Sequence, residues 1–118
     1  MSVGREISRE EATLVISGWR ESGVVIWSQC EVAPLAFSFR GRIVEFSGKT
    51  RVRFLGIDGK SEFVFDIKDD FDIVYGDPRD FPEDAKTVVC SLSFFFLPRA
   101  EYATNKDFIV LSELLQAI

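Results

Sequence analysis

The chain has 118 residues, of which 47% are hydrophobic and 28% are charged, with a formal net charge of −5 and no histidine. This length and composition are typical of one globular domain over residues 1–118 and argue against an intrinsically disordered chain. The lack of histidine excludes hydrolase triads and imidazole-ligated metals, and two separate cysteines cannot close a structural zinc site. We therefore expect no enzyme activity, no metal and no cofactor.

The cysteines and the apolar runs bear on where the protein resides. Cys30 and Cys90 are far apart in the sequence, and the chain begins without a basic-then-apolar leader. Small secreted domains usually contain more cysteines, so we expect cytoplasmic localisation and reduced thiols. No apolar run approaches the ~20 residues that a membrane-spanning helix needs, so no membrane span is predicted.

A helix is predicted over residues 9–22. Ser8 and Glu11 have the spacing of a capping box, in which each side chain accepts a hydrogen bond from the backbone of the other residue. Gly23 suits the left-handed backbone at a helix C-terminus. The apolar residues fall on one helical stripe, which we expect to pack on the sheet with Trp19 as a core anchor; they are Ala12, Val15, Ile16 and Trp19.

Strands are predicted for most of residues 24–112. Asp58 and Gly59 are typical of a hairpin turn. The apolar parity shifts past Gly41, which predicts a β-bulge or a sharp bend of the strand at that glycine. The segments with β-branched, aromatic or alternating apolar residues are 24–30, 36–47, 51–55, 63–67 and 71–75.

The C-terminal part leaves two alternatives open. Residues 87–97 predict a long strand whose even-numbered positions are apolar, so Phe95 lies on the opposite face. There Phe95 either packs under the helix or is exposed as a partner surface. Residues 106–118 fit a helix or a closing strand, and we favour a strand that runs into a last helical turn.

Together these elements predict a mainly β (α+β) fold. The expected architecture is a small antiparallel barrel or a strongly bent sheet of about six strands, preceded by one N-terminal amphipathic helix packed on it. The sequence does not decide between a closed barrel and an open sheet.

Charge is unevenly distributed along the chain. Residues 40–53 contain five basic side chains and one acid, whereas residues 58–84 contain ten acids and three bases. We interpret this contrast as cross-strand charge pairing or a solvated face. The alternative is self-association, in which the basic hairpin of one copy meets the acidic edge of another.

Residues 39–46 resemble the bent second strand of Sm-type small barrels, and this resemblance rests on Gly41. It implies a strongly bent small barrel.

Arg5 and Arg9 have the RxxxR spacing of PilZ-type barrels, which the chain resembles at this point. The family binds a cyclic dinucleotide through this motif and a later [DN]xSxxG motif. In the second motif the acidic position is Glu45 here and the final glycine is Thr50. These departures argue against cyclic dinucleotide binding.

Three classes of function follow, in order of weight. The first is a non-catalytic interaction or regulatory module that binds a protein partner or itself as a homo-oligomer, with Phe95 as the candidate partner surface. The second is a binder of an anionic ligand, a nucleotide or RNA, although the negative net charge argues against nucleic acid. The third is a small enzyme with converging carboxylates or a reactive thiol. The ligand-binding candidates of the second class are the arginines of the basic hairpin, Arg40, Arg42, Arg51 and Arg53.

Overall fold

The computed structural model describes residues 4–32, 35–48, 50–67, 72–76, 88–95 and 107–115. These residues form one helix and one eight-stranded antiparallel sheet, which is not closed into a barrel. The elements in chain order are β1 (Arg5–Ile7), α1 (Arg9–Ser22), β2 (Ile26–Val32), β3 (Leu35–Ser47), β4 (Arg51–Gly56), β5 (Glu62–Asp66), β6 (Asp72–Gly76), β7 (Val88–Phe95) and β8 (Phe108–Leu114).

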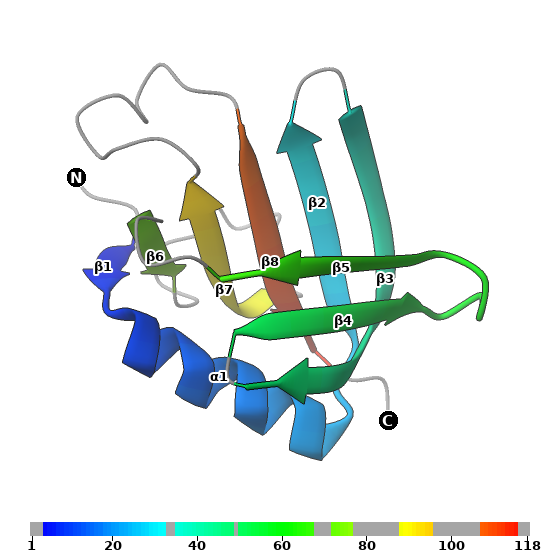
Figure 1. Ribbon diagram of the computed structural model, residues 1–118, viewed down its shortest axis with the longest axis horizontal. Helices are drawn as coiled ribbons and strands as arrows, with labels where there is room; N and C mark the ends of the chain where they lie inside the picture. The colour runs from blue at the N-terminus through cyan, green and yellow to red at the C-terminus, as the bar shows by residue number, and fades with distance from the viewer. Residues whose placement is uncertain are drawn as a thin grey trace.

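The prediction of a mainly β fold with one N-terminal helix is confirmed. The sheet has eight strands rather than about six, and the closed-barrel alternative is wrong. The strands lie in the order β1, β6, β7, β8, β2, β3, β4, β5, so the last strand of the chain is in the middle of the sheet. Figure 1 shows β4 and β5 crossing in front of β2 and β8, with α1 along the bottom. The sheet therefore bends over itself and leaves β1 and β5 as its two edges among the described strands.

Helix α1 has the predicted boundaries and the predicted caps. The backbone N–H of Glu11 donates to Ser8 Oγ at 3.1 Å, and the backbone N–H of Ser8 donates to Glu11 Oε1 at 3.5 Å. Gly23 ends the helix with φ 65°. The face toward the sheet is apolar, since Ala12, Ile16 and Trp19 are buried, as the stripe predicts.

The bend of the sheet follows from β3, which is 13 residues long and pairs with β2 in its first half and β4 in its second. The sequence predicts a bulge or a bend at Gly41. The bulge lies instead between Ile43 and Glu45, where the register with β4 shifts, whereas Gly41 is the residue at which β3 passes from β2 to β4. Val44 is the extra residue and its side chain is exposed. Gly41 has another role, because a Cβ there would lie 2.2 Å from the Leu55 carbonyl oxygen. Its missing side chain lets β3 and β4 approach closely.

Phenylalanine rings fill the space where the bent sheet faces itself. Neighbouring rings from β3, β4 and β5 have centroids 5.1 to 5.9 Å apart, and Phe65 of β5 lies 5.4 Å from Phe94 of β7. Such pairs add stability beyond the area that they bury. The contact between Phe65 and Phe94 joins the β4–β5 hairpin to β7, which lies toward the other edge of the sheet.

The C-terminal segment forms a strand over Phe108–Leu114, so the strand alternative is confirmed there and the helix alternative is wrong. The last helical turn predicted beyond it lies outside the described residues. The predicted turn at Asp58 is present, because its Oδ1 accepts hydrogen bonds from the backbone N–H groups of Lys60 and Ser61.

Candidate functional site

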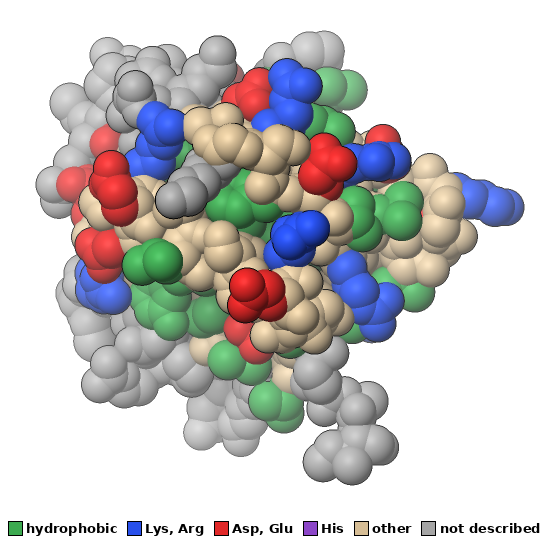
Figure 2. All heavy atoms as spheres, turned by 60° about the horizontal axis from the view of Figure 1, so that its bottom comes forward, with side chains coloured by type: hydrophobic (Ala, Val, Ile, Leu, Met, Phe, Trp, Pro, Cys, Tyr) green, Lys and Arg blue, Asp and Glu red, His purple; other side chains and the backbone are tan. Residues whose placement is uncertain are grey.

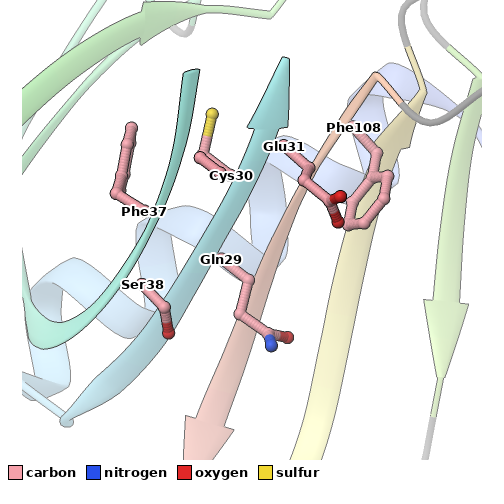
Figure 3. A pocket seen from close by; sticks show the side chains of 7 residues that line it. Gln29, Cys30, Glu31, Phe37, Ser38 and Phe108 are labelled. Carbon is pink, nitrogen blue, oxygen red and sulfur yellow. The ribbon is translucent and has the colours of Figure 1, made fainter. Parts of the chain in front are cut away.

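An open cavity of about 410 Å³ lies on the side of the sheet away from α1, where β2, β3 and the start of β8 are neighbours. Figure 3 shows Gln29, Glu31, Ser38 and Phe108 on one side of these strands, with Cys30 and Phe37 on the other. The lining residues are Gln29, Cys30, Glu31, Ala36, Phe37, Ser38 and Phe108.

The register of the strands explains this grouping. Gln29 is opposite Ser38, and Glu31 is opposite Ala36 on one side and Phe108 on the other. Because side chains alternate between the two faces of a strand, these residues must share a face. Figure 3 accordingly shows the Glu31 carboxylate beside the Phe108 ring.

Trp27, two residues before Gln29 on β2, lies on the same face as the cavity. Its Nε1 donates a hydrogen bond to Ser38 Oγ at 2.6 Å, and 36% of the residue is exposed. The bond orients the serine hydroxyl beside the cavity. The surface thus combines aromatic rings with amide, hydroxyl and carboxylate groups, a mixture typical of protein-binding surfaces.

Phe95, the predicted partner residue, is half-buried on this same face. Its ring centroid lies 6.3 Å from that of Phe108, and the two residues are direct neighbours across β7 and β8. It does not pack under α1. The structure therefore places Phe95 next to the cavity, although it is not a lining residue.

Most of the residues that line the cavity carry no signal of a site in the sequence. Gln29, Glu31 and Ser38 occupy the polar positions of alternating strands, and in sequence such positions are typical of any solvated face. The pairing of β8 with β2 creates the site, because it brings Phe108 beside Glu31. Alternation could have placed these residues outward, but it could not have made them neighbours.

Two of the four candidate arginines are ion-paired with the neighbouring strand. Arg51 Nε lies 3.2 Å from Asp66 Oδ1, and Arg53 Nη2 lies 2.9 Å from Glu62 Oε2. In both arginines this hydrogen bond and the charge of the same acid raise the pKa of the guanidinium. The cross-strand charge pairing expected from the sequence is thus present between β4 and β5.

The other two arginines lie on β3. Arg42 Nε donates to the carbonyl oxygen of Gly23 at 2.9 Å, where it caps the C-terminal end of α1. Arg40 is exposed and has no ion pair among the described residues. Figure 2 shows basic and acidic side chains interspersed over the α1 side of the molecule. The four arginines share a face without forming a free cationic patch.

Both thiols are free and buried. Burial raises the pKa of Cys30. Burial, and next the charge of Glu113, raises the pKa of Cys90 to about 11. A nucleophilic cysteine needs a lowered pKa, so neither thiol has the environment of a catalytic one.

Within the described ranges, no three cysteine or carboxylate side chains are grouped as metal ligands, and α1 is neither long nor apolar enough to cross a membrane. No protein-family model, curated protein or solved structure matches the chain.

Proposed function

We propose that the protein is a non-catalytic interaction module that binds a partner protein through the cavity between β2, β3 and β8. The observation that carries this proposal is the cavity itself, a hollow of about 410 Å³ on the solvent face, bordered by the ring pair of Phe95 and Phe108. This volume lies in the range that accommodates small molecules or protruding side chains.

The lining supports binding rather than catalysis. Its polar groups on the cavity side are one amide, one hydroxyl and one carboxylate, from Gln29, Ser38 and Glu31. General acid–base catalysis generally uses a second titratable group close to the first, and none of the other lining side chains on this side supplies one. Hydrogen bonds to these groups together with contact to Phe108 suit a side chain that is both polar and long.

The alternative, an anionic ligand on the hairpin of residues 40–53, is less well supported. Arg51 and Arg53 already have carboxylate partners on β5, so an anion would have to compete with Asp66 and Glu62. The net charge of −5 further opposes a polyanion such as RNA.

Filling the cavity tests the proposal. Peptides are selected from a random displayed library on the immobilised protein, and their binding is then measured to Ala36→Trp, which places an indole in the cavity. The matched control is Leu35→Trp, because Leu35 is 64% exposed on the same strand and does not line the cavity. We expect Ala36→Trp to weaken binding at least about tenfold, and Leu35→Trp to leave it unchanged.

Amide shifts in a nitrogen-15 NMR titration show where the selected peptides bind. Shifts at Gln29, Glu31, Ser38 and Phe108 support the cavity as the site. Equal binding to both tryptophan variants, or shifts confined to other strands, would remove the basis of this proposal.

A further inference from the structure

Strand β5 lies at an edge of the sheet, and none of its residues lines the cavity. Among the described strands it pairs with β4 alone. The unpaired side of an edge strand presents backbone N–H and C=O groups that another extended segment can bind.

The hydrogen bonds at the two ends of the β4–β5 ladder show which residues present these groups. Gly56 N–H donates to the Ser61 carbonyl oxygen at 2.7 Å, and Ile67 N–H donates to the Thr50 carbonyl oxygen at 2.8 Å. In an antiparallel pair, residues that bond to the neighbouring strand alternate with residues that point away. The odd-numbered residues of this segment therefore bond to β4, and the groups of Glu62, Val64 and Asp66 point outward.

The side chains of β5 alternate between an inner and an outer face, and an incoming strand would contact both. Phe63 and Phe65 are half-buried on the inner face, where their ring centroids are 5.9 Å apart. Val64 is 46% exposed on the outer face, between Glu62 and Asp66. An incoming segment would place alternate side chains against the two rings and the others beside the two acids.

The pairing of β5 with β4 shows which side chains the strand accommodates in a neighbour. Strand β4 places Arg51 and Arg53 against Asp66 and Glu62 on the outer face, and apolar Val52 and Phe54 on the inner face. The side chains of Asp66 and Glu62 remain 44% and 39% exposed, and a carboxylate accepts several hydrogen bonds. The side of β5 that no described strand pairs with thus offers the same acids to a second basic strand.

We propose that the edge of β5 binds an extended segment of a partner protein in which basic residues alternate with apolar ones. The segment pairs antiparallel with residues 62–66, directs its basic side chains to Glu62 and Asp66, and packs its apolar side chains on Phe63 and Phe65. The net charge of −5 favours the approach of such a partner. This site uses none of the residues that line the cavity.

A capped seven-residue peptide of alternating arginine and valine is the probe. We expect it to protect the outward-pointing amides of Glu62, Val64 and Asp66 from hydrogen exchange, while the amides of Phe63 and Phe65 are already protected by β4 in the free protein. A peptide of alternating glutamate and valine should bind at least about tenfold more weakly, because its charges face the same two acids.

Two changes remove the backbone hydrogen bonds alone. The first is the arginine–valine peptide with N-methyl groups on its arginines, because in the proposed pairing the arginine N–H groups face β5. The second is Val64→Pro, which deletes an outward N–H that β4 does not use and is tolerated at a sheet edge. Val64→Thr is the matched control, because it keeps the N–H and the branched shape. We expect Val64→Pro to weaken binding by at least about fivefold, as for one lost hydrogen bond, and Val64→Thr to bind as the wild type does.

No protection at residues 62–66 with millimolar peptide would overturn the proposal, as would unchanged affinity of the N-methylated peptide. Because the N-methylated peptide is tested on the wild-type protein, the result does not depend on Val64→Pro folding. Equal binding of the two charge types would overturn the assigned partner chemistry. Binding unchanged by Ala36→Trp separates this edge from the cavity.

Discussion

At the scale of single residues, the least expected group is a glutamate on the buried side of the sheet. Glu113 is the direct neighbour of Ile26 and Cys90, whose side chains face the core. Its Oε1 accepts a hydrogen bond from Trp19 Nε1 at 2.9 Å and lies 3.6 Å from Cys90 Sγ. A carboxylate at such a position needs hydrogen-bond partners, and α1 supplies one of them.

This environment predicts that the free energy of unfolding decreases as the pH rises through the alkaline range. The folded state raises the pKa of Cys90 from its ordinary value of 9.0 to about 11, so the folded protein retains a proton that the unfolded chain loses. Stability from this group is complete below pH 9 and is lost as the pH rises to about 11. We expect the Cys90 part of this loss to be on the order of 2 kcal/mol, so that the wild type loses more stability over this pH range than Cys90→Ala does.

Urea denaturation at several values between pH 8 and pH 11 measures the effect. Cys90→Ala has a lower starting stability because it removes buried atoms, so the slope against pH is compared rather than the absolute value. Cys30, whose pKa is also raised, is present in both proteins and cancels. Parallel slopes for the two proteins would contradict the assignment to Cys90.

At the scale of elements, the predictions that the structure confirms are those that depend on residues close together in the sequence. The capping box, the apolar stripe and the final glycine locate both ends of α1, because each acts within one helical turn. The parity shift in β3 was also a true signal, but it was assigned to Gly41 rather than to the bulge at Val44. A glycine in a strand marks either a bulge or a close backbone approach, and these two causes look alike in sequence.

Gly41 of β3 and Gly18 of α1 are expected to respond in opposite directions to alanine. In Gly41→Ala the new Cβ would lie 2.2 Å from the carbonyl oxygen and 2.8 Å from the carbonyl carbon of Leu55, so β3 and β4 must separate. We expect a loss of more than about 2 kcal/mol. In Gly18→Ala the new Cβ has no neighbour within 4 Å, and the helix should gain roughly 0.5–1 kcal/mol. Thermal and urea unfolding measure both, and similar changes in the two variants would refute this reading of Gly41.

At the scale of the whole molecule, the order of the strands decides which segments are indispensable. Strand β8 pairs with β7 on one side and with β2 on the other, although it is the last strand in sequence. Strand β1 pairs only with β6, among the described strands. Removal of β8 therefore splits the sheet, whereas removal of β1 shortens one edge.

Two truncations test this difference. A chain that ends at residue 106 lacks β8, and we expect it to lose cooperative unfolding in urea and the dispersed amide spectrum of a folded protein. A chain that begins at Ser8 lacks β1 but keeps the helix cap, and we expect it to fold with lower stability, because buried Ile7 is removed. Cooperative unfolding of the shorter C-terminal variant would show that β8 is not needed to join the two halves.

Less of the candidate site than of the fold could be predicted from the sequence. The outward placement of Arg40, Arg42, Arg51 and Arg53 follows from alternation, yet their hydrogen bonds depend on the neighbouring segment. Phe95 was singled out as a residue on the second face, and only the pairing of β7 with β8 shows that Phe108 lies beside it. The cavity requires three strands to be neighbours, and two of these are far apart in the chain.

The sequence by itself determined the helix with its caps, the β-rich character of the rest and the faces of most strands. These properties depend on interactions within a few residues and on the twofold alternation of a strand. The tertiary structure alone decided the strand order, the open sheet, the central place of β8 and the neighbours of each outward side chain. The pairing of distant strands depends on how the whole chain buries its phenylalanine-rich face, and no short segment encodes that choice.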